Sequence, residues 1–475
     1  DTVTINGANG SSENIVGTAT NDMINGLSGN DDLTGGAGAD TLNGGDGNDG
    51  FFYYSLADFI DNGAILDSVL GGNGTDRIRI FDTNAYTIDV ADSWDRSRLI
   101  EVLEQGSNNA NDIAITLGET AFTAGIRTST LEQDADASGT NPVNAAIAAA
   151  NQELTLLGSA GGDNITAGLG NDLVKGGAGD DTLVGAAGAD SIYGEAGNDI
   201  FLIADEDHHG SGEITDGGDG IDVVRYTATD GGTLTLESGT SVEQVRISNA
   251  DGIRTGTTGE SIDASNVTAT ISLFGNDGDN ALTGNDKDNV LEGAGGADTL
   301  IGAIGADTLF GGNGDDVFLY ANQAELLDST ELLDFVISGG EGTDRISVAG
   351  GLAVANTVWF GNVVSMEELF VTDTAKSSIA LDASAENAGI ASINISASAT
   401  DGNVIDLREY ESLGTTLVGS ATNTNVLTGG AGNDTVTGGA SADTMLGGGG
   451  NDVFVFNEST VSGDGVNGGS VDGTE

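Results

Sequence analysis

A nine-residue unit that recurs through the chain constrains its fold more than any other feature. The unit first runs from residue 17 as GTATNDMIN, GLSGNDDLT, GGAGADTLN and GGDGNDGFF, with aspartate in sixth place and an apolar residue in eighth. Glycines in the first, second and fourth places permit positive φ angles, which predicts a tight turn followed by a short strand. Such a strand becomes stable only when successive turns stack and bury their apolar residues against one another.

Four blocks of this unit begin at residues 17, 158, 275 and 420. They contain eighteen contiguous copies, fifteen with aspartate in sixth place and three with asparagine. Each of the first three blocks is followed, after a gap, by one lone copy that begins at residue 71, 217 or 339. If two units make one full coil, residues eighteen apart stack, which places Ile24 on Leu42 and Leu33 on Phe51. The sixth-place aspartates then stack in the same way.

Stacked carboxylates indicate a cation site. Two bare carboxylates held this close would each disfavour the ionisation of the other. A hard divalent cation between them converts the repulsion into coordination, with turn carbonyls completing an all-oxygen shell. Because the chain has no cysteine and only two histidines, the ligands favour Ca²⁺ over Zn²⁺ or Cu²⁺. The predicted metal ligands are Asp22, Asp31, Asp40, Asp49, Asp76, Asp163, Asp172, Asp181, Asp190, Asp199, Asp222, Asp298, Asp307, Asp316, Asp344, Asp434, Asp443 and Asp452.

The charge balance excludes several classes of partner and activity. Thirteen Lys+Arg against 75 Asp+Glu give a net charge of −62. Phosphates are bound by clustered basic residues, so neither nucleic acid nor an anionic membrane surface is expected as a partner. No apolar run reaches the roughly 18 residues of a spanning helix, so membrane insertion is not expected. The motifs HExxH, GxSxG and GxxxxGK[ST] are missing, and we predict no catalytic residue and no enzymatic activity.

The units GGAGADTLN, GGAGDDTLV and GGNGDDVFL resemble the RTX repeat, GGxGxDxUx, of secreted Gram-negative proteins. The resemblance implies a parallel β-roll that holds Ca²⁺ in the turns between coils. It also implies that one turn supplies the carbonyls of its second and fourth residues and its aspartate. The turn eighteen residues later supplies the carbonyls of its first and third residues and its aspartate. The implied ligand sets are Thr18, Thr20 and Asp22 with Gly35, Ala37 and Asp40, and Gly177, Gly179 and Asp181 with Gly194, Ala196 and Asp199.

Where the sequence departs from the repeat, we expect the sites to bind ions more weakly. Asn280, Asn289 and Asn425 replace the sixth-place aspartate, and Lys287 replaces the fourth-place glycine, so we expect weak or absent ions where blocks three and four begin. Sites are expected throughout blocks one and two, at the pairs 298/316 and 434/452, and at the lone copies.

A longer periodicity organises the chain into modules. Each block ends in an apolar strand. In the first three modules this strand is followed by an acidic stretch, the lone copy and a further strand. A small signature of apolar residues around a glutamate (Glu101, Glu243 or Glu367) comes next. We therefore expect an all-β fold, a parallel β-roll or β-solenoid of blocks joined by β-rich segments. The expected divisions are 1–80, 81–157, 158–225, 226–274, 275–348, 349–418 and 419–475, with RTX blocks in the first, third, fifth and seventh.

Three features of the connecting segments are interpreted individually. Residues 144–154 (NAAIAAANQEL) predict a short helix. His208 and His209 are interpreted as part of a solvated acidic loop, with a metal or acid/base site as the alternative. Trp94 and Trp359 are interpreted as packing residues rather than sugar-binding platforms.

The sequence favours a secreted, calcium-dependent structural protein that folds outside the cell and assembles into a surface layer, sheath or filament. Its expected partners are Ca²⁺, further copies of itself through the acidic loops 58–67, 204–216 and 325–334, and a cell-surface polysaccharide. One alternative is the stalk of a large RTX adhesin or exotoxin, and another is the RTX tail of a secreted hydrolase or epimerase. Because the chain stops inside a further lone copy (GGSVDGTE), we expect a segment of a longer polypeptide.

Overall fold

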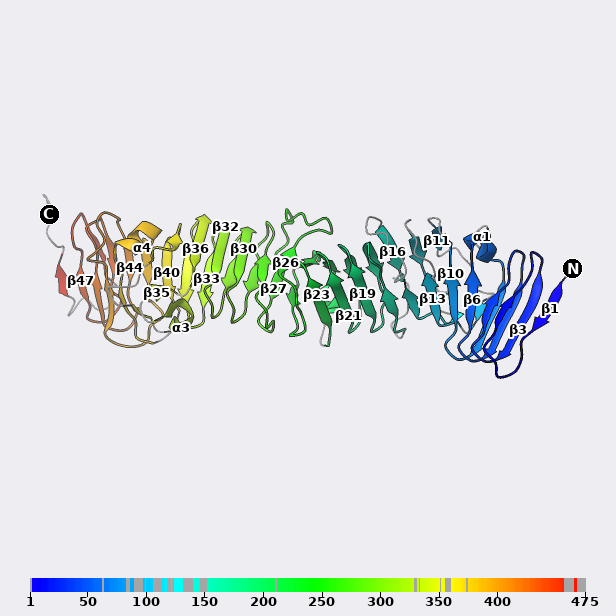
Figure 1. Ribbon diagram of the computed structural model, residues 1–475. Coiled ribbons are helices and arrows are strands. Elements are labelled where there is room, and N and C mark those ends of the chain that lie inside the picture. Colours follow the sequence, from blue (N-terminus) through cyan, green and yellow to red (C-terminus); the bar gives the residue numbers. More distant parts are fainter. Residues whose placement is uncertain are drawn as a thin grey trace. The chain divides into compact units, whose positions relative to one another are not determined.

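The chain forms two compact units built almost entirely from short parallel strands (Figure 1). Unit 1 comprises Asp1–Thr227 and Gly239–Glu243, and unit 2 comprises Ala228–Ser238 and Gln244–Glu475. The computed structural model describes residues 2–61, 64–82, 86–88, 97–98, 100–105, 113–117, 121, 124–130, 140–145, 152–209, 212–328, 331–332, 334–350, 352–354, 360–372, 375–456 and 465–467.

In unit 1, strands that are not consecutive in sequence pair in parallel and form three rows. The first row is β1 (Val3–Asn6), β3 (Asp22–Ser28), β5 (Thr41–Asp46), β9 (Ser68–Asn73) and β12 (Ser97–Arg98). The second row is β2 (Asn14–Val16), β4 (Asp32–Thr34), β6 (Gly50–Tyr53), β10 (Arg77–Ile80), β13 (Val102–Gln105), β15 (Thr128–Thr130), β17 (Thr155–Leu157), β19 (Leu173–Ala178), β21 (Ser191–Ala196) and β23 (Ile214–Asp219). The third row is β11 (Tyr86–Ile88), β14 (Ile113–Thr116), β16 (Thr140–Asn144), β18 (Gly162–Thr166), β20 (Thr182–Val184), β22 (Ile200–Ile203) and β24 (Val223–Tyr226).

Unit 2 repeats this arrangement. One row is β26 (Gln244–Ile247), β28 (Ser272–Phe274), β30 (Val290–Gly295), β32 (Thr308–Asn313), β36 (Val336–Glu341) and β39 (Val363–Val364). The second row is β25 (Thr233–Thr235), β27 (Ser261–Asp263), β29 (Ala281–Thr283), β31 (Thr299–Ile301), β33 (Val317–Tyr320), β37 (Arg345–Val348), β40 (Glu368–Val371), β42 (Ser392–Asn394), β44 (Thr416–Val418), β46 (Thr435–Thr437) and β48 (Val453–Val455). The third row is β38 (Ala353–Val354), β41 (Ser378–Ala380), β43 (Asn403–Asp406), β45 (Asn425–Thr428), β47 (Thr444–Leu446) and β49 (Gly465–Asn467).

The register follows the repeat. Ile24 pairs with Leu42 and Leu33 pairs with Phe51, as the eighteen-residue coil predicts. These four side chains are at most 1% exposed, because the middle residue of each short strand points inward while its neighbours point outward. The expectation of an all-β, parallel solenoid is therefore confirmed, and each coil contributes apolar residues to a continuous core within its unit.

The glycines of the turns are required by the close stacking of the coils. Gly36 has a φ of +96°, and a Cβ on it would lie 2.1 Å from the carbonyl oxygen of Thr18 in the preceding coil. Gly177 has a φ of +114° and stands in the same relation to Ser159, at 2.0 Å. Any larger residue would push neighbouring coils apart, so the glycines fix the distance at which the sixth-place aspartates face one another.

Helices are short and occupy corners between strands. Those whose bounds lie within the described ranges are α1 (Leu56–Phe59), the 3₁₀ helix η1 (Glu206–His208), α3 (Gln323–Leu326) and α4 (Ala383–Ala388). The first three follow β6, β22 and β33, where the acidic loops begin, and small antiparallel hairpins continue two of these loops: β7 (Ile60–Asp61) with β8 (Ala64–Ile65), and β34 (Leu327–Asp328) with β35 (Glu331–Leu332).

The predicted helix at 144–154 is not formed where its residues are described. Asn144 ends β16, and residues 152–154 are irregular. Residues 146–151 of that prediction lie outside the described part of the chain, as do Trp94 and Trp359. The strand prevails at Asn144 because β16 pairs with β18 in register, with Val143 buried opposite Ile165.

Candidate calcium sites

The sixth-place aspartates form rows that run through successive coils. The backbone N–H of Asp163 donates to Oδ1 of Asp181 over 2.7 Å, and the N–H of Asp181 donates to Oδ1 of Asp199 over 2.8 Å. The same hydrogen bond joins Asp31 to Asp49 over 2.8 Å. Of the eighteen predicted ligands, all except the half-buried Asp452 are at most 3% exposed. The repeat therefore stacks buried carboxylates at every second turn, as the sequence predicts.

The second oxygen of most of these carboxylates has no hydrogen-bond partner. Oδ1 is held by the preceding coil, whereas Oδ2 lies inside its own turn and is buried. A buried acceptor without a partner is costly, and a buried charge without one is more so. The aspartates with such an Oδ2 are Asp31, Asp40, Asp49, Asp76, Asp181, Asp190, Asp199, Asp222, Asp298, Asp307, Asp316, Asp344 and Asp452.

Burial and mutual repulsion act on the ionisation of these rows. Burial, together with the charges of Asp163 and Asp199, raises the pKa of Asp181 to about 8. Burial also raises the pKa values of Asp190 and Asp298 to about 7. Without a cation, these carboxylates therefore hold protons near neutral pH, and a divalent ion would supply the charge that the protein lacks.

In the turns at which these aspartate rows begin, Oδ2 of the aspartate already accepts a hydrogen bond from its own turn. The backbone N–H of Thr18 donates to Oδ2 of Asp22 over 2.6 Å, and its hydroxyl donates to the same oxygen over 2.8 Å. In later blocks, Oδ2 accepts from a second-place N–H at Asp163, Asp172 and Asp434 (2.6, 3.0 and 2.9 Å). The hydrogen bonds from Thr18 lower the pKa of Asp22, opposite to the effect within the rows.

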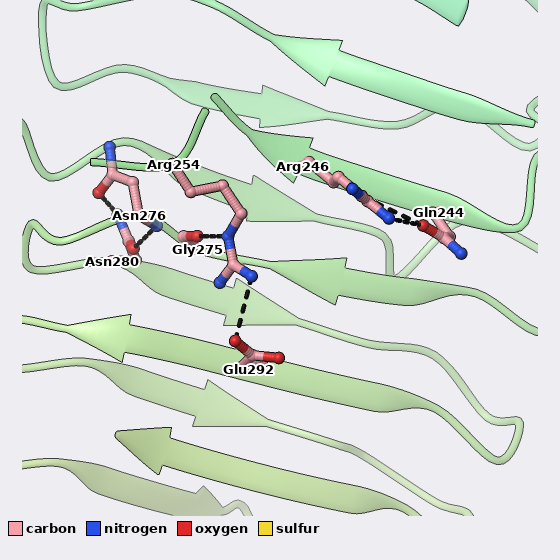
Figure 2. Close-up of polar contacts among 7 residues, drawn as sticks. All are labelled: Gln244, Arg246, Arg254, Gly275, Asn276, Asn280 and Glu292. Atoms are coloured by element: carbon pink, nitrogen blue, oxygen red, sulfur yellow. Dashed lines mark hydrogen bonds and ion pairs between the residues drawn. The ribbon is translucent and has the colours of Figure 1, made fainter. Parts of the chain in front are cut away.

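Asparagine closes the first turns of block three without a charge. In Figure 2, Asn276 and Asn280 bond to each other, and the side-chain N–H₂ of Asn280 donates to Oδ1 of Asn276 over 3.1 Å. Beside them, the Arg254 guanidinium donates to the carbonyl of Gly275 and to Oε1 of Glu292, the latter over 3.1 Å. A protein cation and two amides thus satisfy oxygens at the start of this block.

Asn425 plays the same part at the start of block four. Its side-chain N–H₂ donates to the carbonyl of Gly438 over 2.8 Å and to Oδ1 of Asp443 over 2.9 Å. Gly438 and Asp443 occupy the first and sixth places of the turn eighteen residues later, the places of the ligands that the RTX resemblance assigns to the later turn. The amide therefore donates hydrogen bonds to groups that would otherwise face a cation.

Three buried acids that close rows were not predicted as site residues. The N–H of Asp40 donates to Oδ1 of Asp67 over 2.7 Å, and the N–H of Asp307 donates to Oδ1 of Asp334 over 3.2 Å. The hydroxyls of Tyr53 and Tyr320 donate to Oδ2 of Asp67 and Asp334 respectively. Each acid ends an acidic loop shortly before the GG of the lone copy, a spacing that could have identified it.

The corresponding acid of the second module is Glu213, and it corrects the interpretation of the histidines. His209 and Glu213 are only 4% exposed, and Nδ1 of His209 lies 3.5 Å from Oε1 of Glu213. His209 is therefore not part of a solvated loop; it is buried beside the acid that corresponds to Asp67 and Asp334. The three acidic loops likewise turn their closing acids inward instead of presenting all of their charge to solvent.

The arrangement fits a hard cation held by few side chains. Within the described ranges, no three or more His, Cys, Asp or Glu side chains gather as a metal-binding group. Each ion would therefore be coordinated by the two carboxylates of two stacked turns together with backbone carbonyls. Ca²⁺ accepts such an all-oxygen shell.

Comparison with known families agrees with this chemistry. Residues 16–51, 157–190, 176–202, 274–309, 292–322 and 421–454 match the model of the RTX calcium-binding nonapeptide repeat. The chain carries RTX calcium-binding repeats in all four blocks. No curated protein is detectably similar to the chain.

This result makes the chain a calcium-binding repeat protein, and proteins with RTX repeats are typically secreted. No helix in the part of the chain that the structure describes is long and apolar enough to cross a membrane. The lone RTX copies and the closing acids lie outside the matched segments.

Proposed function

We propose that the chain is a secreted, non-catalytic structural protein that folds when it binds Ca²⁺ outside the cell. The observation that carries this proposal is the set of buried Oδ2 atoms without partners along the aspartate rows. Ions that bind only the folded rows would stabilise them by RT ln(1 + [L]/Kd) per site. Extracellular calcium modules bind at roughly 10⁻⁴–10⁻³ M, so the rows would be empty in the cytosol and filled after export.

Circular dichroism in EGTA and in millimolar Ca²⁺ tests the folding step. We expect a β spectrum with calcium at pH 8 and its loss on chelation, because the ionised rows then repel. The RTX blocks also contain turns that asparagine or an N–H closes, so the loss should begin within the aspartate rows. An unchanged β spectrum in EGTA at pH 8 would refute the proposal.

The protein's assembly into a surface layer, sheath or filament is the second part of the proposal. Modules that recur along a chain present similar lateral surfaces repeatedly, which suits a non-closing assembly. The net charge of −62 opposes contact between such surfaces, and a Debye length of about 8 Å does not remove repulsion at contact. Divalent ions between acidic surfaces would remove it, so assembly should require calcium.

Light scattering during a calcium titration, followed by electron microscopy, tests assembly. Ordered polymers that dissociate in chelator would support the surface-layer or filament role. A strictly monomeric species at saturating Ca²⁺ would instead favour the stalk of an adhesin or exotoxin, where the folded modules act as a spacer. Binding of a cell-surface polysaccharide can be measured with the same two samples.

A further inference from the structure

The glutamate of each module's apolar signature continues an aspartate row beyond the nonapeptides. The N–H of Asp76 donates to Oε2 of Glu101 over 2.8 Å. In the next modules, Asp222 donates to Glu243 over 2.7 Å and Asp344 to Glu367 over 2.8 Å. These are the bonds that join successive aspartates within a row, although the sequence steps are 25, 21 and 23 residues instead of 18.

The strand register places these glutamates in the aspartate position. Within a block, the residues that follow stacked aspartates are strand partners, as Asp32 and Gly50 are after Asp31 and Asp49. Arg77 pairs with Val102 in the same way after Asp76 and Glu101.

Unit 2 repeats this register between β37 and β40. Arg345 pairs with Glu368, the residues that follow Asp344 and Glu367. The structure therefore substitutes a short apolar-Glu segment for a whole nonapeptide turn.

Within a block, first-place glycines face the carbonyl oxygen of the first residue of the next turn in their row. In the third module, a carbonyl oxygen takes the same position between the lone copy and the glutamate segment. A Cβ on Gly311 would lie 2.6 Å from the carbonyl oxygen of Gly339, the first residue of the next turn. A Cβ on Gly339 would lie 2.0 Å from the carbonyl oxygen of Ser365, two residues before Glu367. The segment around Glu367 thus brings both a carbonyl and a carboxylate to the turn of Asp344.

The aspartate at each of these steps carries an unsatisfied oxygen. Asp76, Asp222 and Asp344 are 0% exposed, and Oδ2 of each has no hydrogen-bond partner. The paired glutamates are half-buried (Glu101 and Glu367) or exposed (Glu243), so solvent and ions reach this end of the row.

We propose that each of these aspartate–glutamate pairs holds one further Ca²⁺ ion, outside the RTX nonapeptides. The sites are Asp76 with Glu101, Asp222 with Glu243, and Asp344 with Glu367. Two carboxylates neutralise the ion, and carbonyl and water oxygens complete its shell. The row ends there, because the next strand partners of the signature are Thr128 after Arg127 and Ser392 after Ala391, and neither Arg127 nor Ala391 supplies a carboxylate.

In the first and third modules, the other aspartate row ends differently. At Asp67 and Asp334, a tyrosine hydroxyl bonds the oxygen that would face a cation. In these two modules, the row that ends at Glu101 or Glu367 is therefore the one open to an additional ion. In every module an ion at the proposed pair would link the lone copy to the connecting segment that follows it.

Counting bound calcium in substituted full-length chains tests the proposal, which rests on the calcium-dependent folding proposed above. The variant E101Q/E243Q/E367Q keeps an oxygen that can accept each aspartate N–H but removes the charges. Equilibrium dialysis with Ca²⁺ should show three ions fewer than the wild type, and each single substitution one ion fewer. The matched control E104Q/E237Q/E368Q removes three charges nearby and should leave the count unchanged.

The outcomes separate this proposal from the function on which it rests. An unchanged count in both triple variants would overturn the additional sites while leaving calcium-dependent folding intact. A wild type that binds no calcium, or folds equally in EGTA, would overturn the proposed function itself. Loss of more than one ion per single substitution, or equal losses in variant and control, would also overturn the proposal of local sites.

Discussion

The backbone N–H of Asp181 donates to Oδ1 of Asp199, 2.8 Å away and eighteen residues further along the chain. Each of these two aspartates has a second oxygen that is buried without a partner. One contact therefore both fixes the register of neighbouring coils and brings uncompensated charge together. The physical consequence is a fold whose stability depends on what neutralises its rows.

Replacing an aspartate inside a row should strengthen the calcium-free protein. In Asp181→Asn, the amide removes the repulsion and can donate as Asn425 does. We expect its coils to gain about 1–3 kcal/mol in EGTA, the typical cost of an unsatisfied buried group, and to bind fewer ions. Hydrogen exchange of residues 158–203 in EGTA measures the gain. The exposed neighbour Asp180 provides the control Asp180→Asn, which should change protection little.

Acid should partly replace calcium. The pKa values of about 8 for Asp181 and about 7 for Asp190 lie above the unfolded value of 3.8, so the calcium-free folded state binds more protons than the unfolded state. Its stability therefore falls as pH rises from about 4 to about 8. We expect the chelated chain to gain β structure when the pH is lowered from 8 to 5, as measured by circular dichroism. A chelated chain whose β content rises with pH would contradict this assignment.

Calcium-loaded protein should respond in the opposite direction. Protons compete with the ion for the same carboxylates, so calcium affinity should fall on acidification, and binding at pH 7 should release protons. Titration in two buffers of different ionisation enthalpy measures the number released. Binding that is independent of pH between 6 and 8 would argue against ligands with raised pKa values.

Asn425→Asp should create a calcium site at the start of block four. The substitution exchanges the amide that donates to Gly438 and Asp443 for a second carboxylate beside Asp443. We expect one additional bound ion and a less stable calcium-free form. The control is Asn433→Asp in the exposed fifth place of the same block, which should leave the ion count unchanged.

Ala294→Gly should stabilise block three with or without calcium. Ala294 occupies a second place with a φ of +87°, a conformation that costs a residue with a Cβ roughly 1–2 kcal/mol. Glycine also has greater conformational freedom in the unfolded chain, and this entropy offsets part of the relieved strain. We therefore expect a net increase of up to about 1 kcal/mol in the free energy of unfolding. Ala281→Gly, on the exposed face of β29, should instead destabilise. Thermal unfolding of both variants measures the difference.

Tyr320→Phe should weaken the closed end of its row. The hydroxyl of the buried Tyr320 donates to the buried Asp334, and its loss leaves Oδ2 of Asp334 without that donor. We expect a loss of about 1–3 kcal/mol in urea unfolding with calcium present. Tyr193→Phe, on the surface beside Lys175, should cost much less. Equal losses would show that the closing hydrogen bond contributes nothing particular.

The repeat predicted the register because spacing alone determines which residues stack. The pairing of Ile24 with Leu42 and the burial of the aspartates follow from eighteen residues per coil, without knowledge of the turns. The ligand assignments themselves stay predictions.

The eighteen-residue period could not predict the closing residues, because inserted loops precede them; only their short distance from the GG of the lone copy identifies them. Asp67 and Glu213 enter the rows through loops that vary between modules. Tertiary contacts restore the register: Asp40 donates to Asp67, and the residues after Asp190 and Glu213 are strand partners. At Asn144, where the expected helix begins, the structure has a strand for a related reason. The alanine-rich composition of residues 144–154 favours a helix locally, but pairing of β16 with β18 binds the start of the segment into the sheet.

The corner that follows each block's last strand accepts different lengths of chain. From Asp49 to Asp76 the step is 27 residues, from Asp199 to Asp222 it is 23, and from Asp316 to Asp344 it is 28, yet the same hydrogen bond closes all three. Different lengths there leave the stacking undisturbed, so evolution or an engineer can lengthen this corner while the closing acids Asp67, Glu213 and Asp334 keep their places. A peptide epitope or a small enzyme grafted at that corner would be displayed once per module, with its attachment points held by the coils on either side.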